Sequence, residues 1–341
     1  MINTAMWAKA LRVIPRISRD QWKELDLVSR WLIASRAAVF IMTALAAAIG
    51  GLLAYRYGSF SWDLFIMSIL GLVFAHATNN LLNDYIDHRK GIDRKNYYRA
   101  QYGPQPLEHG LMGKKEFLSY IWVTGLIALS IGIYLVLRTN YWTMLFLLAG
   151  LIFLVFYTWP LKYFGLGEPS VILVWGPLMV GGTFFVVTGG VWQNWMIPLS
   201  LVYALGPTTV LFGKHIDKRA ADHEKGVGTL PVIIGEKAAR YVTIAMWIAQ
   251  YILLGWLVAN RQLGFSTLVV LLALPKLVST AKVFARPRPE TEPEGLAPDT
   301  WPLYLSAHAF TYNRQFGSLF LLGLIADVIL YKAGLTVWGV L

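Results

Sequence analysis

The segment FLSYIWVTGLIALSIGIYLVL, from Phe117 to Leu137, contains no charged side chain. An α-helix rises about 1.5 Å per residue, so about 20 apolar residues cross the hydrocarbon core of a bilayer. Comparable hydrophobic stretches recur along the whole length of the sequence. This recurrence predicts an integral membrane protein built from α-helices, and not a soluble globule with one long buried helix.

The composition leads to the same class of protein. Of the 341 residues, 56% are hydrophobic and only 14% are charged, whereas soluble domains carry about 25% charged residues. The net charge of +11 is typical of cytoplasmic loops beside anionic lipid, so we expect membrane lipid and not nucleic acid as a partner. The absence of cysteine excludes disulfides, thiolate catalysis and cysteine-ligated metals.

The pattern of apolar stretches predicts nine membrane-spanning helices. They cover residues 33–55, 64–83, 117–137, 141–158, 170–188, 195–213, 240–259, 264–283 and 316–333. With the N-terminus in the cytoplasm, this count places 26 of the 30 Lys and Arg residues on the cytoplasmic side, as the positive-inside rule requires. Only Arg56, Arg138, Arg261 and Lys332 lie on the opposite side.

We therefore predict an all-α integral membrane protein with nine spans around a central cavity and a cytoplasmic N-terminus. Residues 1–32 form an amphipathic N-terminal segment without a cleaved signal peptide, and its interfacial helix, residues 7–30, is interrupted at Pro15. Residues 33–335 form a single domain. Its long cytoplasmic loops are residues 84–115, 213–239 and the Pro-rich stretch 284–315.

A polar stripe marks the end of the second predicted span. His76, Asn80, Asn83 and Asp87 are separated by four, three and four residues, so they share one helical face, with Asp84 at its edge. Such a stripe is costly against lipid and predicts a polar cavity between helices. Ordinary loop charges explain the following residues 89–95, but they do not explain asparagines within an apolar run.

A second acidic cluster, with Asp217, Asp222 and Glu224, follows the sixth predicted span. Both clusters emerge on the cytoplasmic face, because the second and sixth spans run in the same direction. Mg²⁺ takes carboxylate and amide oxygens and bridges to substrate phosphates, and interleaved Lys and Arg neutralise further phosphate charge. The apolar interior accepts a hydrocarbon tail, so the combination indicates a lipid-like diphosphate substrate.

These motifs resemble those of a known family. Asn83-Asp-Tyr-Ile-Asp87, continuing to Gly91-Ile-Asp93, is similar to the first aspartate-rich motif of the UbiA superfamily of intramembrane prenyltransferases. Asp222-His-Glu-Lys-Gly-Val-Gly-Thr-Leu-Pro231 resembles the tail of its second motif, and Tyr157-Thr-Trp-Pro-Leu-Lys-Tyr-Phe-Gly-Leu-Gly-Glu168 resembles the loop after its fourth span. The resemblance covers residues 30–335 and is greatest to the 1,4-dihydroxy-2-naphthoate prenyltransferases of menaquinone synthesis.

The second motif departs from the family pattern. Its two acids are usually four residues apart, but Asp217 and Asp222 are five apart, which is about 140° around an ideal helix. Either the helix ends or bulges between them, or Asp217 turns away and His215 or Glu224 takes its place. Asp222 is therefore the safer assignment as a metal ligand.

The resemblance implies Mg²⁺-dependent transfer of an isoprenyl group from a polyprenyl diphosphate to an aromatic quinone precursor. The implied Mg²⁺ ligands are Asn83, Asp84, Asp87, Asp217 and Asp222. The diphosphate would be contacted by Arg36, Lys90, Lys162 and Lys214, although Arg36 can also snorkel to the interface. The allylic cation would be stabilised by the rings of Tyr157, Trp159 and Tyr163, for which an interfacial aromatic belt is the alternative.

The remaining candidates concern the acceptor and the isoprenyl chain. They are His76, Asn80, Tyr163 and Arg314, of which His76 is the deepest and Arg314 could instead mark a helix start. Two other functions remain open, a UbiA-like terpene cyclase and a transporter of anionic lipid-like substrates. A CDP-alcohol phosphotransferase is excluded because its Asp-Gly-x-x-Ala-Arg string is absent. We expect a prokaryotic inner-membrane protein with its active site facing the cytoplasm.

Overall fold

The computed structural model describes residues 2–93, 103–296 and 300–335, and in these ranges the regular elements are helices. Eight described helices are long and apolar enough to cross a membrane. They are Ala37–Tyr57, Trp62–Arg89, Lys114–Arg138, Gly167–Val187, Met196–Asp217, Glu236–Ala259, Phe265–Phe284 and Tyr304–Lys332. Each coincides with a predicted span, so the all-α membrane class is confirmed.

The fourth predicted span, residues 141–158, corresponds to a shorter helix. This helix, α8 (Thr143–Phe156), has 14 apolar or weakly polar residues, fewer than the roughly 20 that span a bilayer core without tilt or thinning. The count of nine spans therefore stays a prediction, as do the central cavity and the cytoplasmic position of the N-terminus. Arg94 and Lys95 of the basic loop lie outside the described residues.

The chain divides into two compact units, Met1–Leu45 with Ile66–Trp159, and Ala46–Phe65 with Pro160–Leu341. The first unit contains the short helices α1 (Thr4–Arg12), α2 (Arg19–Glu24) and α3 (Leu27–Ala34). It also contains most of α5 (Trp62–Arg89) and all of α7 (Lys114–Arg138) and α8. Pro15 lies between α1 and α2 outside any helix, so the predicted interruption there is confirmed.

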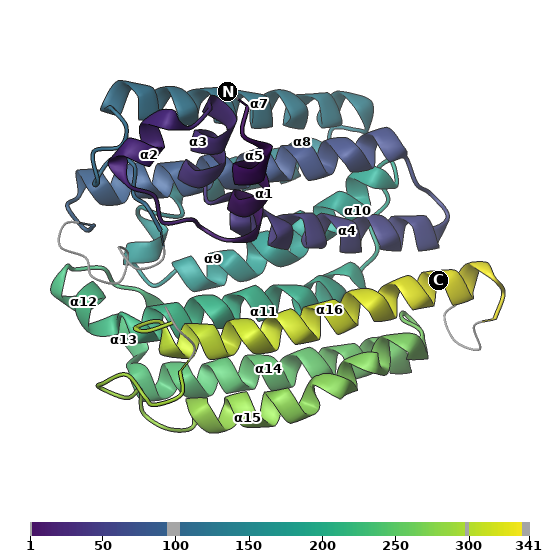
Figure 1. The fold of residues 1–341 in the computed structure, drawn as a ribbon. Coiled ribbons are helices and arrows are strands. Elements are labelled where there is room, and N and C mark those ends of the chain that lie inside the picture. The colour runs from purple at the N-terminus through teal and green to yellow at the C-terminus, as the bar shows by residue number, and fades with distance from the viewer. Residues whose placement is uncertain (1, 94–102, 297–299, 336–341) are drawn as a thin grey trace. The chain divides into compact units, whose positions relative to one another are not determined.

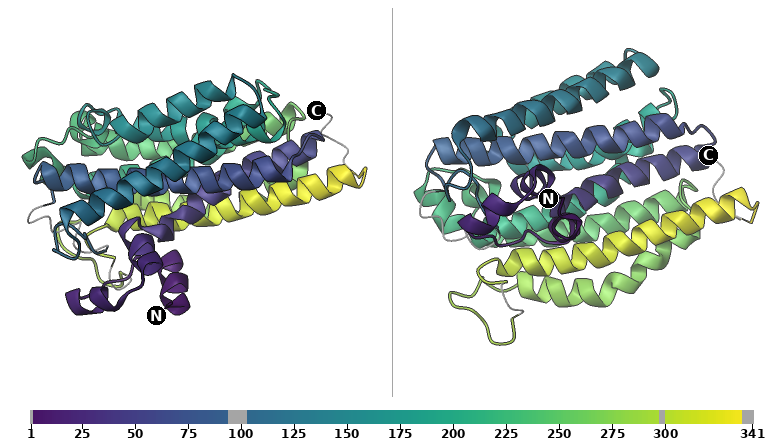
Figure 2. Two further views of the ribbon diagram at one scale, coloured as in Figure 1. Left: turned by 90° about the horizontal axis from the view of Figure 1, so that it is seen from above. Right: turned by 45° about the horizontal axis from the view of Figure 1, so that its top comes forward.

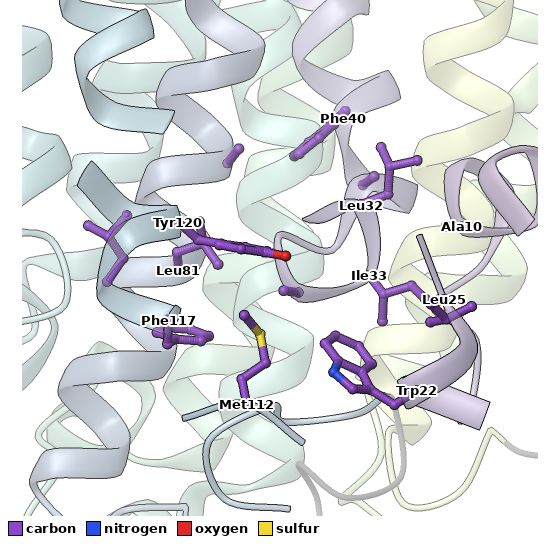
Figure 3. Packing of buried hydrophobic residues seen from close by; sticks show 14 residues of the cluster. Ala10, Trp22, Leu25, Leu32, Ile33, Phe40, Leu81, Met112, Phe117 and Tyr120 are labelled. Atoms are coloured by element: carbon purple, nitrogen blue, oxygen red, sulfur yellow. The ribbon is translucent and has the colours of Figure 1, made fainter. Parts of the chain in front are cut away.

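The N-terminal segment buries apolar side chains inside the first unit. Trp22 of α2 is 2% exposed and belongs to one hydrophobic cluster with Ile33, Met112 and Phe117. Figure 3 shows Met112 between the rings of Trp22 and Phe117. Burying side chains of this size contributes about 1.5–3 kcal/mol each relative to exposure, so α2 is held by packing on its own unit.

Polar caps fix the connections between these short helices. Ser18 and Gln21 form a capping box at the start of α2, which satisfies backbone donors that have no partner within the helix. Asp26 caps α3 through the backbone N–H of Ser29, and its Oδ1 also accepts the indole N–H of Trp7 at 3.0 Å. One carboxylate therefore holds α1 and α3 together.

The second unit is organised around α11 (Met196–Asp217), which packs against both α14 (Glu236–Ala259) and α16 (Tyr304–Lys332); Figure 1 shows α11 alongside α16. Gly206 of α11 permits a close approach, because a Cβ there would lie 1.9 Å from Oδ1 of Asn313. Small residues at helix contacts allow such approach in membrane proteins. α16 begins twelve residues before the predicted span 316–333, so Arg314 lies inside the helix and does not mark its start.

A buried ion pair connects two further helices of this unit. Arg56, near the end of α4 (Phe40–Tyr57), places Nε 3.2 Å from Oδ2 of Asp327 in α16. The side chains are 0% and 1% exposed, and Nη1 of Arg56 donates to the carbonyl of Gln262 at 2.7 Å. Asp327, for which the sequence indicated no role, therefore neutralises Arg56, one of the four cations that the sequence analysis expects on the side opposite the basic loops.

The span Gly167–Val187 contains an irregular middle. It runs through α9 (Gly167–Leu173), the wider π-type turns of η3 (Val174–Gly181) and α10 (Gly182–Val187). Pro177 lies within η3 and cannot donate a backbone hydrogen bond, which is a usual cause of such a change of winding. The sequence analysis treated this span as a regular helix.

Candidate active site

The first acidic motif lies at the end of α5, where the helix stops in a defined turn. Gly91 has a φ of 68°, a conformation that glycine adopts at little cost. The N–H of Gly91 donates to the carbonyl of His88, and the N–H of Ile92 donates to the carbonyl of Asp87 at 2.9 Å. This pair of bonds is the Schellman motif, and it places Asp87 in the last turn of α5, 8% exposed.

The inner part of the polar stripe contacts the first predicted span. Asn80 donates from Nδ2 to the carbonyl of Ser35 at 2.9 Å, and Nδ1 of His76 lies 2.7 Å from Oγ1 of Thr43. The ring of Phe40 packs at 5.6 Å from that of His76. These contacts supply polar partners that the stripe needs in an apolar environment. The cavity that we expected beside the stripe stays a prediction.

Asp84 forms an ion pair with Arg36. Nη2 of Arg36 contacts Oδ1 of Asp84, and the two side chains are 12% and 6% exposed. Arg36 follows α3 with a φ of 59°, an uncommon conformation for a residue other than glycine. The sequence analysis expected Arg36 to contact a diphosphate, and in this structure its guanidinium contacts a carboxylate of the first motif.

The second acidic motif is divided between two helices. α11 ends at Asp217, Lys218 leaves helical geometry with a φ of −107°, and α12 (Arg219–Glu224) follows. The alternative in which the helix ends between Asp217 and Asp222 is therefore confirmed. Asp222 is 2% exposed, and its Oδ1 lies 3.0 Å from Nζ of Lys218.

The second motif ends in the same kind of turn as the first. The N–H of Gly226 donates to His223, and the N–H of Val227 donates to the carbonyl of Asp222 at 2.8 Å. Gly226 has a φ of 69°. The two turns also share a sequence pattern, Asp87-His-Arg-Lys-Gly-Ile92 and Asp222-His-Glu-Lys-Gly-Val227. Each turn thus follows a buried aspartate that stands two residues before the last residue of its helix.

Both motifs contain buried amide or carboxylate oxygens without a hydrogen-bond donor, beside the buried hydroxyl of Thr229. These oxygens are Oδ1 of Asn83 and Oδ2 of Asp222, and neither has a partner among the described residues. A buried unsatisfied acceptor costs about 1–3 kcal/mol, and amide and carboxylate oxygens are ligands of Mg²⁺. No group of three or more His, Asp or Glu side chains forms a metal-sized cluster in the described ranges, so the ligand set is a proposal from the chemistry of these oxygens.

Asp217 differs from these residues because both of its oxygens have donors. Oδ1 accepts from the backbone N–H of Leu305 at 3.0 Å, and Oδ2 accepts from that of Ser306 at 2.9 Å. Nε of Arg288 lies 3.2 Å from Oδ1. Asp217 was expected among the metal ligands, and the structure instead places its carboxylate at the start of α16.

The loop after α8 is joined to the second motif by Glu168. Its Oε1 lies 2.6 Å from Nδ1 of His215, and its Oε2 accepts the backbone N–H of Leu230 at 3.3 Å. Phe164 forms an isolated parallel β-bridge with Gly228. A Cβ on Gly228 would lie 2.3 Å from the carbonyl oxygen of Tyr163, so this glycine is required for the loop to approach.

The other predicted residues lie on several elements. Trp159 carries Nζ of Lys90 4.8 Å from the centre of its ring, so this ring does stack with a cation. Tyr157 follows α8, and Tyr163 closes the short helix η2 (Leu161–Tyr163). Lys162 is buried, Lys214 is half-buried and Arg314 is exposed on α16.

The sequence analysis gave no role to three residues of these networks, namely Lys218, Glu168 and Arg288. Lys218 had a signal, because it stands four residues before Asp222 and such pairs meet on a helical face. The repeated pattern Asp-His-x-Lys-Gly was a second signal, which relates Asp222 to Asp87. Arg288 had none, because its partner lies 71 residues away in the sequence.

The sequence matches the model of the UbiA prenyltransferase family over residues 42–297. The 1,4-dihydroxy-2-naphthoate octaprenyltransferase of Bacillus subtilis is 26% identical over 70% of this chain and 76% of its own length. The 2-carboxy-1,4-naphthoquinone phytyltransferase of a Synechocystis species is 25% identical over 72% and 79%. UbiA prenyltransferase domain-containing protein 1 of Gallus gallus is 27% identical over 74% and 76%.

Solved structures show the same fold. A UbiA homolog from Aeropyrum pernix superposes with a TM-score of 0.64 at 18% identity, covering 84% of this chain and 97% of the homolog. A homolog from Archaeoglobus fulgidus bound to GPP and Mg²⁺ gives a TM-score of 0.57 at 16% identity, covering 88% and 99%. Together with the family match and the membrane-spanning helices, these likenesses show that the chain is an integral membrane prenyltransferase and belongs to the UbiA prenyltransferase family.

Proposed function

We propose that this prenyltransferase joins the isoprenyl group of a polyprenyl diphosphate to an aromatic quinone precursor, 1,4-dihydroxy-2-naphthoate or a close relative. One observation carries the proposal: two helix-end turns of the same sequence pattern each bury one carboxylate of an acidic motif. The naphthoate acceptor is supported by the names of the relatives in Bacillus subtilis and Synechocystis.

The residues of both motifs fit Mg²⁺. Oδ1 of Asn83 and Oδ2 of Asp222 lack donors among the described residues, and oxygen ligands of this kind suit a hard cation that bridges to phosphate. We assign Asn83, Asp84, Asp87 and Asp222 as its ligands, and a related structure that contains GPP and Mg²⁺ supports the choice of metal. When bound, Mg²⁺ neutralises negative charge that develops on the departing diphosphate.

Basic side chains then bind the diphosphate. Lys90, Lys162 and Lys214 are assigned to its oxygens, since ammonium groups neutralise phosphate charge through charge-assisted hydrogen bonds. Arg36 is assigned to the same anion but contacts Asp84 in this structure. When the diphosphate is bound at the first motif, the N–H groups of Arg36 would therefore be shared between Asp84 and a phosphate oxygen.

The organic step breaks the bond between the allylic carbon and the diphosphate oxygen and forms a bond to an electron-rich aromatic carbon. That carbon then loses a proton or, where it carries the carboxylate, CO₂. Tyr157 and Tyr163 are assigned to the allylic cation, because an aromatic ring face attracts positive charge. His76 and Asn80 are assigned to the acceptor or the first isoprene unit. Arg314, which is exposed on α16, is assigned to the acceptor.

Product analysis tests this function. The purified protein in lipid nanodiscs is incubated with prenyl diphosphates of several lengths and a panel of aromatic acceptors, with and without Mg²⁺. We expect a product whose mass equals the acceptor plus the isoprenyl group, less the hydrogen or carboxyl group that it replaces, only when metal and a dihydroxynaphthoate are both present. A hydrocarbon product formed equally well without acceptor would instead indicate a cyclase, and no consumption of any diphosphate would contradict the proposal.

A further inference from the structure

The carboxylate of Asp217 caps α16 from a distant part of the chain. The residue that precedes α16, Leu303, provides no side-chain cap, and the first N–H groups of a helix have no partner within it. Asp217 supplies that partner through its bonds to the N–H groups of Leu305 and Ser306. Its negative charge also stabilises the positive end of the helix dipole.

The packing of α11 shows independently that this face of the helix contacts α16. A Cβ on Gly213 would lie 2.8 Å from the backbone N of Ser306. Oγ of Ser306 is 3.4 Å from the carbonyl of Val210. Positions 210, 213 and 217 are separated by three and four residues, so they share one face of α11. Asp217 therefore continues a surface that is occupied by the first turn of α16.

Arg288 extends this contact to the segment between α15 (Leu274–Phe284) and α16. Besides Asp217, its guanidinium donates to the carbonyls of Pro289 and Pro302, and it lies 4.4 Å from the centre of the Trp301 ring. Its backbone N–H donates to Oε1 of Glu236 at 3.0 Å. Figure 2 shows this segment returning to the start of α16, and Arg288 contacts both of its ends.

Comparison of the two motifs separates Asp217 from the metal-binding pattern. Four residues before Asp87 stands Asn83, and four residues before Asp222 stands Lys218. Asp217 instead corresponds to the apolar Leu82. The position equivalent to Asn83 is therefore occupied by a cation, whose Nζ already contacts Asp222.

We propose that Asp217 is a positioning residue and not a metal ligand. With Arg288 it forms a clamp that holds the first turn of α16 and residues 288–289 and 301–302 to the end of α11. The clamp thereby positions Lys218 and Asp222, which follow the end of α11. The ligand role within the second motif is left to Asp222 alone, with Lys218 beside it. This inference rests on the proposed function for the role of Asp222.

The test compares Asp217→Asn, Arg288→Gln and their double variant with Asp222→Asn. Asparagine keeps the size of Asp217 but directs an N–H₂ group at a backbone donor. Arg286→Gln is the matched control, because Arg286 is an exposed arginine of the same segment. Two quantities are measured on the full-length protein in detergent: the melting temperature, and the Mg²⁺ concentration that half-saturates thermal stabilisation in the presence of inorganic diphosphate.

We expect Asp217→Asn and Arg288→Gln each to lower the melting temperature by about 5 °C, from loss of a helix cap and a buried charge pair. The double variant should lose less than the sum of the two single variants, since both remove the contact between Asp217 and Arg288. Each single variant should raise the half-saturating Mg²⁺ concentration only about two- to threefold, because Asp222 is then displaced but still present. Asp222→Asn should raise it about tenfold or more, and Arg286→Gln should change neither quantity.

The proposal is overturned if Asp217→Asn raises the half-saturating Mg²⁺ concentration as much as Asp222→Asn does. It is also overturned if the melting-temperature losses of Asp217→Asn and Arg288→Gln simply add. If wild-type protein shows neither Mg²⁺-dependent stabilisation nor prenyl transfer, the proposed function fails. The melting temperature of the double variant, compared with those of the two single variants, still tests whether Asp217 and Arg288 act together.

Discussion

Asp87 and Asp222 occupy the same position in two helix-end turns. The backbone carbonyl of each accepts the N–H of the residue five positions later, at 2.9 Å for Asp87 and 2.8 Å for Asp222. In each turn a glycine with a φ close to 70° stands four residues after the aspartate. The backbone hence fixes both aspartates at helix ends before any ligand is considered.

Replacement of either aspartate should remove activity without unfolding the protein. We expect Asp87→Ala and Asp222→Ala each to reduce prenyl transfer by at least about a thousandfold, because loss of a metal ligand removes transition-state charge stabilisation worth several kcal/mol. The measurement is product formation by mass spectrometry beside the melting temperature of each variant. Asp20→Ala, at an exposed surface ion pair, is the control and should behave as wild type. Retention of substantial transfer by either variant would argue against its role as a ligand.

Activity should require a divalent metal. Without one, the carboxylates of the acidic motifs would repel the diphosphate, since a bound cation is the largest local charge in such a site. Excess chelator should therefore abolish product formation, and Mg²⁺ added beyond the chelator should restore it. A turnover rate that is the same in chelator as in Mg²⁺ would be incompatible with the proposed mechanism.

The glycine that ends the second motif should be replaceable by asparagine better than by alanine. No atom lies within 4 Å of a Cβ placed on Gly226, so the effect of substitution comes from its φ of 69° alone. Gly226→Ala should cost about 1 kcal/mol of stability and should lower turnover by shifting Asp222. Gly226→Asn, which tolerates this conformation, should retain more of both. Equal behaviour of the two variants would mean that the turn does not set the position of Asp222.

The buried pair of Arg56 and Asp327 should be strongly coupled. Arg56→Met leaves the carboxylate of Asp327 buried without its cation and should cost about 3–5 kcal/mol of stability. Replacing both residues, as Arg56→Met with Asp327→Leu, should recover most of this loss because no charge then remains buried. Thermal unfolding of the two single variants and the double variant in detergent measures the coupling. A double variant that is as unstable as the sum of the singles would refute it.

Much of the fold followed from hydrophobic length, because a bilayer permits few alternatives to helices of sufficient span. The segment 117–137 illustrates this, since it coincides with the interior of α7. Helix ends were less predictable. The last span was placed to begin at residue 316, but α16 starts at Tyr304. Polar residues such as Ser306 and His308 interrupt the apolar pattern of its first turns, although Leu305 and Ala309 there are buried.

The candidate site was predictable where chemistry and local spacing coincide, as in residues 76–87. It was less predictable where a residue acts through a distant contact. The five-residue separation of Asp217 and Asp222 left open whether Asp217 belongs to the motif, and the partners of Asp217 at positions 288, 305 and 306 are set by tertiary packing. No local pattern distinguishes a capping aspartate of this kind from a metal ligand.

The pairing of Arg56 with Asp327 also has a consequence for biogenesis. Arg56 belongs to the first span to leave the ribosome, and Asp327 belongs to the last. During synthesis the arginine therefore enters the membrane long before its counterion exists, and it must remain at the interface or in water until the final helix inserts. A chain that stops short of α16 would carry an uncompensated guanidinium that quality-control proteases and chaperones can detect. Arg56 thus gains its counterion only when synthesis of the last helix is complete.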